Sequence, residues 1–264
     1  MNDSWNTGAT YDAMTKLKDR MTFFKDINRR KAEGSRAHIL LIQPSQLIWV
    51  NRRYGILAGD QLIRDIARYL DTLDPDYSAY RIANSRFVLI GPACTRQQAD
   101  AFAARVRRRF DESWQITAGE RPYSIRARAY LVHLFLTPED VGENALIDKI
   151  SYALSSLSRL GSDGMLFFDE AIKQAMQHQE YVLREIRYAI DHRTFEMYYQ
   201  PIYSCREGRF TSAESLIRLF SRDGAFISPG EFIPMAEDNG LIDQISWIVL
   251  EKVCRFLGSH PELP

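Results

Sequence analysis

Two apolar runs on either side of a glycine-containing turn, within the stretch Tyr198–Gly240, most constrain how this chain can fold. The turn lies at Glu207-Gly208, and each run has the length and composition of a β-strand. Because side chains on a strand alternate between its two faces, Glu214, Leu216 and Arg218 of the second run share one face. A carboxylate and a guanidinium on an inward face cost free energy unless a ligand, a metal ion or each other satisfies them. The stretch therefore predicts a pair of strands with a binding site on one face.

The residues around this site resemble the start of an EAL domain, the family of cyclic di-GMP phosphodiesterases. Glu214-Ser215-Leu216 stands where that family has Glu-Ala-Leu, and residues 227–242 match the loop and helix that follow it. The similarity extends from about Glu180 to the last residue, Pro264. It implies that Glu214 is a ligand of a divalent metal ion.

The same resemblance implies a cyclic di-GMP site beside that metal. Gln200 and Arg218 would contact the bound dinucleotide, and Leu216 would line its pocket. The chemistry is consistent, because phosphodiester hydrolysis needs a metal-activated water and a cation that offsets phosphate charge. The residues alone leave one alternative, which is a buried ion pair between Glu214 and Arg218 that binds no ligand.

The EAL-like portion contains only the start of the barrel that the resemblance implies. A barrel of the (β/α) type has eight strands, and we expect two strands and two helices before the chain ends at Pro264. The other metal carboxylates, and the base that orients water, would come from later strands of a longer protein. We therefore expect that this chain alone hydrolyses no cyclic di-GMP and needs no cofactor. Mg²⁺ or Mn²⁺ would bind only where the EAL domain is complete.

Composition and charge limit the partners of the chain. Its 34 basic and 34 acidic side chains balance, which removes a bulk electrostatic reason to bind nucleic acid or an anionic membrane. Three separated cysteines and five scattered histidines indicate neither a disulfide framework nor a zinc site. No apolar run reaches the roughly 18 residues of a membrane span, so we expect a cytoplasmic protein without a membrane segment. The arginines at 105–109 are interpreted as a solvated helix face.

Hydrophobic periodicity predicts a mixed α/β (α+β) chain, in which an antiparallel-rich sheet covered by helices precedes the incomplete start of a (β/α)-type barrel. Periods of three and four predict helices at Asp12–Asn28, Pro44–Tyr54, Thr95–Phe110, Asn144–Leu160 and Ala171–His192, and one capped by Gly59-Asp60. Apolar runs predict strands at Ala37–Ile42, Tyr80–Ile82, Phe87–Ile90, Tyr123–Leu136 and Met165–Phe168. We expect a disordered N-terminus (1–11), a first domain (12–170), a connecting helix (171–192) and a second domain (193–264).

The first domain resembles a GGDEF domain, the diguanylate cyclase family, over about residues 12–170. Residues 12–20 stand where that family has its first motif, and the segment Asn51–Asp60 mirrors its nucleotide-binding helix. The signature hairpin, Gly-Gly-Asp-Glu-Phe in the family, reads Ala83-Asn84-Ser85-Arg86-Phe87. Only the phenylalanine of the signature is retained.

The replaced positions are those that the cyclase reaction requires. Enzymes of this kind need carboxylates to hold the two metal ions that polarise a triphosphate. Gln43 stands at the strand-end aspartate, and Ser85 and Arg86 stand at the two acidic hairpin positions. Ala83 and Asn84 replace the glycines that let the backbone approach the nucleotide. We therefore expect a degenerate domain without cyclase activity.

Two positions of the nucleotide pocket are retained. Asn51 and Asp60 match residues that the family uses to read guanine and ribose, which leaves GTP as a second ligand of a vestigial pocket. The alternative is that Asn51 lies on a helix face and that Asp60 is an N-cap residue.

These observations predict a cyclic di-GMP signalling protein whose inactive GGDEF-like domain regulates or scaffolds an attached EAL domain. The alternative is that the complete parent is an active, metal-dependent cyclic di-GMP phosphodiesterase, and a more distant one is an RNA or protein adaptor. Because an incomplete barrel leaves apolar strands uncovered, we also expect homodimers or other self-association. The side chains expected to be partly exposed are Tyr198, Ile202, Leu216, Leu219 and Phe220.

Overall fold

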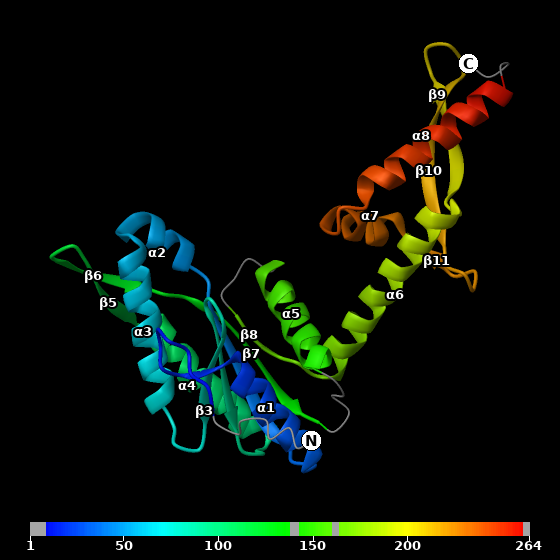
Figure 1. Cartoon of the computed structure of the whole chain (residues 1–264). Helices are drawn as coiled ribbons and strands as arrows, with labels where there is room; N and C mark the ends of the chain where they lie inside the picture. The colour runs from blue at the N-terminus through cyan, green and yellow to red at the C-terminus, as the bar shows by residue number, and fades with distance from the viewer. Residues whose placement is uncertain (1–8, 138–142, 160–163, 261–264) are drawn as a thin grey trace, which may run out of the picture. The chain divides into compact units, whose positions relative to one another are not determined.

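The computed structural model describes residues 9–137, 143–159 and 164–260. Of the N-terminus expected to be disordered (1–11), residues 1–8 lie outside the described part, whereas the backbone N–H of Thr10 donates to Oγ1 of Thr22 at 2.7 Å and Tyr11 forms a β-bridge with Lys18. The chain forms two compact units, Met1–Lys173 and Gln174–Pro264. Both contain helices and strands, which confirms the predicted mixed α/β class (Figure 1).

The first unit is built on a six-stranded sheet with the strand order β1-β3-β4-β2-β7-β8. Its three inner pairs are antiparallel, whereas the two outer pairs, β1–β3 and β7–β8, are parallel. The sheet is therefore antiparallel-rich, as predicted. The strands are β1 (Lys18–Asp19), β2 (Ala37–Pro44), β3 (Ser78–Ala83), β4 (Arg86–Gly91), β7 (Ala129–Leu136) and β8 (Met165–Phe167).

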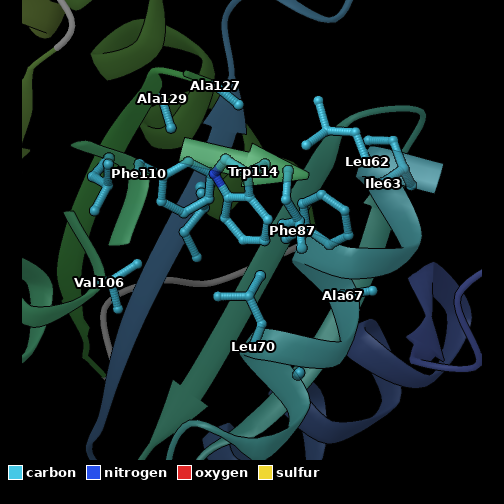
Figure 2. Close-up of a cluster of buried hydrophobic side chains, with 14 of the residues drawn as sticks. Leu62, Ile63, Ala67, Leu70, Phe87, Val106, Phe110, Trp114, Ala127 and Ala129 are labelled. Atoms are coloured by element: carbon cyan, nitrogen blue, oxygen red, sulfur yellow. The ribbon is translucent and has the colours of Figure 1, made fainter. Parts of the chain in front are cut away.

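Five helices belong to this unit, and the main core lies between the sheet and the apolar faces of α3 and α4. Apolar residues of α3 recur at three and four positions, so that Leu62, Ile66 and Leu70 are all buried. Figure 2 shows side chains of these two helices gathered around Phe87 and Trp114. The helices are α1 (Arg20–Ala32), α2 (Leu47–Tyr54), α3 (Ile56–Thr72), α4 (Arg96–Asp111) and α5 (Glu143–Arg159).

The helix predicted from Asp12 begins only at Arg20, so that prediction was wrong at its start. Asp12 accepts hydrogen bonds from the backbone N–H and the hydroxyl of Thr15, which stabilises a turn instead. Asp19 then caps the helix by accepting from the backbone N–H of Thr22. Local side-chain bonds thus override the helical periodicity of this segment.

Two further predictions are corrected in the middle of the chain. The single strand expected at Tyr123–Leu136 is two strands, because β6 (Arg121–Arg126) leaves the main sheet to pair with β5 (Ser113–Ala118), which was not predicted. α3 starts directly after Gly55, whose φ of 90° ends α2. Asp60 therefore lies inside α3 and is not an N-cap residue.

The second unit pairs a three-stranded antiparallel sheet, in the order β11-β10-β9, with three helices. Its core contains Val182, Phe195, Leu219, Phe232 and Ile248, so the expected exposure of Leu219 was wrong. The elements are α6 (Glu170–His192), β9 (Glu196–Ser204), β10 (Arg209–Phe220), β11 (Phe226–Ile227), α7 (Pro229–Asp238) and α8 (Ile242–Ser259). The first turn of α6 precedes the boundary between the units, which follows Lys173. Among the described residues no helix is long and apolar enough to cross a membrane.

Candidate functional site

The first unit contains a cleft of about 680 Å³ where β2 ends, beside the α2–α3 pair and the β3–β4 turn. The chain folds this way because β2 is buried and apolar from Ile39 to Ile42, and the polar Gln43 follows near its C-terminal end. The cleft brings together five residues that the sequence predicted for one pocket, namely Gln43, Asn51, Asp60, Asn84 and Ser85. Ala83, Arg86 and Phe87 do not line it, and Phe87 is part of the core.

A guanidinium and an amide are hydrogen-bonded beside this cleft, at two of the positions where the sequence already indicated that carboxylates of the family are replaced. Arg86 donates from Nε to Oε1 of Gln43 at 2.8 Å, which links β4 to the end of β2. Among the described residues no group of three or more His, Cys, Asp or Glu side chains is placed to hold a metal ion. The residues present therefore do not fit a two-metal site.

Arg81 also lines the cleft, and sequence analysis missed it. Its Nη1 lies 2.8 Å from Oδ1 of Asp12, and Nη2 donates to the backbone oxygen of Asn84 at 2.6 Å. Burial opposes the ionisation of Asp12, but hydrogen bonds from Thr15 and Arg81 outweigh it and hold the pKa of Asp12 below 3.8. The contact joins residues 69 positions apart, and no sequence spacing could have indicated it.

The retained polar residue Asn51 is placed against a glycine of the neighbouring helix. A Cβ added at Gly59 would lie 1.8 Å from Oδ1 of Asn51, so only glycine allows this approach. Oδ1 of Asn51 is buried and has no hydrogen-bond partner among the described residues. An unsatisfied buried acceptor is costly, and a donor on a bound ligand would satisfy it.

The second candidate site is one face of the β9–β10 pair. Gln200 lies opposite Glu214, and Leu216 lies opposite Tyr198, in antiparallel register. Side chains of directly opposed residues point to the same face, so Gln200, Glu214, Leu216 and Arg218 share it. The other face is covered by α8, where Tyr199 stacks on a phenylalanine with ring centroids 4.1 Å apart.

The buried Glu214–Arg218 ion pair that the sequence left open is not formed. Glu214 is exposed, and its carboxylate makes no ion pair with Arg218 within the described residues. Arg218 instead donates to the backbone oxygen of Ile217 at 2.9 Å, and its guanidinium lies 5.5 Å from the ring centroid of Tyr198. Both charged groups are thus available to a ligand, but a single carboxylate cannot hold a metal pair.

Beyond these predicted residues, Glu185 of α6 fixes the turn that follows β10. It is 2% exposed and accepts from the backbone N, Nε and Nη2 of Arg222 at 3.0, 3.1 and 2.7 Å. The hydrogen bonds from Arg222 lower the pKa of Glu185 and outweigh the opposing effect of burial. A glutamate beside the buried positions Val182 and Ile186 was the sequence signal for this contact.

Comparisons with known proteins agree with both halves of this description. The family model of the diguanylate cyclase GGDEF domain matches residues 9–145, more than half of the chain, and the EAL domain model matches residues 183–263. The bifunctional diguanylate cyclase/cyclic di-GMP phosphodiesterase MucR of Pseudomonas aeruginosa is 27% identical over 252 residues, covering 94% of this chain and 36% of MucR. The cyclic di-GMP phosphodiesterase PdeR of Escherichia coli is 26% identical over 250 residues, covering 93% of this chain and 37% of PdeR. The chain thus spans about a third of the length of the curated relatives it matches.

Solved structures share the fold. The Vibrio cholerae LapD S helix-GGDEF-EAL structure, bound to c-di-GMP, gives a TM-score of 0.58 at 17% identity and covers 95% of this chain and 58% of its own. The GGDEF domain of DgcB from Caulobacter crescentus with its coiled coil, in complex with c-di-GMP, gives a TM-score of 0.53 at 18% identity, covering 60% of this chain and 85% of its own.

Proposed function

Because this chain belongs to the diguanylate cyclase GGDEF-domain family and continues into an EAL domain, we propose that it serves cyclic di-GMP signalling through a GGDEF domain that makes no cyclic di-GMP. In this proposal the GGDEF domain regulates or scaffolds the attached EAL domain. The observation that carries the proposal is the hydrogen bond from Arg86 to Gln43, a residue that lines the cleft.

The physical reason is electrostatic. Two divalent cations beside a triphosphate need several carboxylate ligands. At the replaced positions this cleft has the amide of Gln43, the hydroxyl of Ser85 and the nearby guanidinium of Arg86, and the one carboxylate among its described lining residues is Asp60. A guanidinium repels a metal ion and has no lone pair with which to bind it.

We predict that the purified chain, given GTP with Mg²⁺ or Mn²⁺, forms no more cyclic di-GMP than a heat-inactivated sample does. Chromatography of the nucleotide products measures this. The triple variant Gln43→Asp, Ser85→Asp, Arg86→Glu should not recover full activity, because Ala83 and Asn84 still restrict the approach of the phosphates. Product from the unmodified chain above that background would overturn the proposal.

A second candidate function is nucleotide binding without turnover in the same cleft, and the unpaired Oδ1 of Asn51 favours it. We predict weak GTP binding that EDTA does not change, since no metal ligand takes part. Gly59→Ala should lower the affinity about tenfold, because the new Cβ displaces Asn51. Isothermal titration measures it, with Asp65→Ala, elsewhere on α3, as the control; equal loss in both variants would place the nucleotide elsewhere.

For the EAL half, the alternative is a parent protein that hydrolyses cyclic di-GMP with Mg²⁺ or Mn²⁺ once the domain is complete. In this chain, Gln200, Leu216 and Arg218 supply one wall of a site, and Glu214 supplies one metal ligand. The phosphodiesterase activity of a whole protein would therefore depend on further metal ligands and a base. Whether the gene encodes such residues after Pro264 distinguishes a regulatory protein from an active phosphodiesterase.

We predict that this chain does not hydrolyse cyclic di-GMP and binds it more weakly than micromolar. Arg218→Ala should reduce the residual binding about tenfold, since a charge-assisted bond to phosphate is lost. Arg209→Ala is the matched control, because Arg209 lies on the same strand and pairs with Glu207. Tight binding in calorimetry would mean that a second copy supplies the missing walls, which is the self-association we propose for the half-exposed Tyr198 and Ile202.

Nucleic-acid binding is not proposed. Of the arginines in α4, Arg105 pairs with Asp74, and Arg109 lies over the ring of Trp114. Only Arg107 and Arg108 extend from this helix face without a contact of that kind among the described residues. Two such arginines, on a helix whose aromatic residues are buried, do not form a nucleic-acid surface.

A further inference from the structure

The junction of α2 and α3 carries the densest group of exposed apolar side chains in the described part of the first unit. Ile48, Trp49, Ile56 and Leu57 are 69%, 52%, 70% and 80% exposed, and all four fall within ten consecutive residues. We call residues 48–57 the α2–α3 corner. Side chains this exposed contribute almost nothing to the core, so their apolar character needs another reason.

The corner is also positively charged. Arg52 and Arg53 are exposed between the two apolar pairs, and neither forms an ion pair with any described residue. Residues 45–59 contain no acidic side chain. On the adjoining β5–β6 hairpin, Glu120 and Arg121 balance each other in charge. The net charge of the whole chain is zero, but that of the corner is positive.

An aromatic series holds the corner in place. The rings of Trp49 and Tyr54 lie 5.7 Å apart, and Tyr54 contacts Tyr123 of β6 with ring centroids 4.8 Å apart. Gly55, at a φ of 90°, turns the chain sharply between the two helices. Figure 1 shows α2, α3 and the β5–β6 hairpin at the same end of the sheet. These contacts therefore hold the exposed apolar side chains of the α2–α3 corner in a defined position.

We propose that the α2–α3 corner is a docking surface for an anionic membrane. Aliphatic side chains with a tryptophan, flanked by arginines, are the composition of segments that insert into the headgroup region. The exposed side chains of the corner would lie on the bilayer without crossing it. Two corners of separate copies would bring four arginines together without an acid, which disfavours self-pairing. This function goes beyond the regulatory role proposed above and does not depend on it.

The test is sedimentation of the full chain with vesicles made of phosphatidylcholine and phosphatidylglycerol in equal parts, and with vesicles of phosphatidylcholine alone. We expect binding only to the anionic vesicles, weakened by salt. Replacing Arg52 or Arg53 by Gln should lower the affinity about fivefold each. The emission of Trp49 should shift to the blue on binding, and Trp49→Phe identifies that signal.

The double variant Ile56→Asp, Leu57→Asp should abolish sedimentation with vesicles. It is suited to the test because acidic residues in the first turn of a helix are favourable, so α3 should remain folded. Met21→Asp is the matched control, since Met21 is 63% exposed in the first turn of α1. Circular dichroism checks both folds. No binding to anionic vesicles, equal binding to the neutral ones, or binding retained by the double variant would each overturn the proposal. The proposal would also be overturned if the chain alone formed an oligomer and the double variant were a monomer, because the corner would then be a protein interface.

Discussion

Acidification from about pH 7 to about pH 5 is expected to lower the free energy of unfolding of the first unit by about 2 kcal/mol for each of two buried histidines. His38 on β2 and His133 on β7 are 0% and 1% exposed, and their rings lie 5.7 Å apart. Burial lowers the pKa of both to about 4. For His38 the neighbouring His133 adds to this effect, whereas Asp100 opposes it for both.

The sign follows from proton uptake. The unfolded histidines titrate near pH 6.5, and the folded ones near 4, so between these values the unfolded state binds more protons. Stability is therefore full above about pH 6.5 and falls as the pH drops toward 4. Asp12 and Asp19, whose pKa values lie below 3.8, titrate outside this window.

Urea unfolding at a series of pH values measures the slope. The double variant His38→Leu, His133→Leu should flatten it, while replacing the exposed His192 by Gln should not. Nε2 of His38 and Nδ1 of His133 are buried without a partner among the described residues. The double variant therefore removes two unsatisfied polar atoms as well as two titrating groups. A slope that persists in the variant would assign the pH dependence to other residues.

Phe232→Ala is expected to destabilise the second unit by about 3–5 kcal/mol. Phe232 on α7 is fully buried and lies 5.9 Å from Phe195, ring to ring, in the centre of the small core of this unit. Truncation would leave a cavity that the surrounding helices cannot close, and a loss of this size is a large part of the stability of a small domain. The second unit should unfold at a much lower urea concentration.

Far-UV circular dichroism during urea unfolding follows this transition. Phe226→Ala is the control, because Phe226 is a phenylalanine of the same unit with 54% exposure. It should cost less than about 1 kcal/mol. Equal losses in the two variants would contradict the assignment of Phe232 to the core.

The sequence predicted the sheet core and the pocket residues for different reasons. β2 was found because the run Ala37–Ile42, with four apolar residues in a row from Ile39, predicts a strand buried on both faces. Gln43, Asn51 and Asp60 were brought to one cleft by family resemblance, since their spacing alone predicts no contact. Glu214 and Arg218 were placed on one face by the two-residue period of a strand, which holds whether or not they pair.

The errors share a different cause, which is competition between local bonds and distant packing. The period of three and four from Asp12 is real, but Asp12 and Asp19 bind nearby backbone groups and delay the helix to Arg20. Leu219 lies on the face that helices cover, and periodicity cannot say which face of a strand is covered. Arg81 reaches Asp12 across 69 positions, a distance that no local pattern encodes.

The hydrogen bonds from three donors of Arg222 to Glu185 limit where α6 can gain or lose residues. A single inserted residue between Glu185 and Phe195 would rotate Glu185 by about 100° around the helix axis. Its carboxylate would then leave the backbone N–H of Arg222 without an acceptor. A shift of one whole turn would place Tyr181 or Ala189 at that position, and neither supplies a carboxylate. Insertions and deletions in α6 should therefore be tolerated only on the N-terminal side of Glu185. The number of residues between the two units can then vary while Glu185 keeps its orientation toward Arg222.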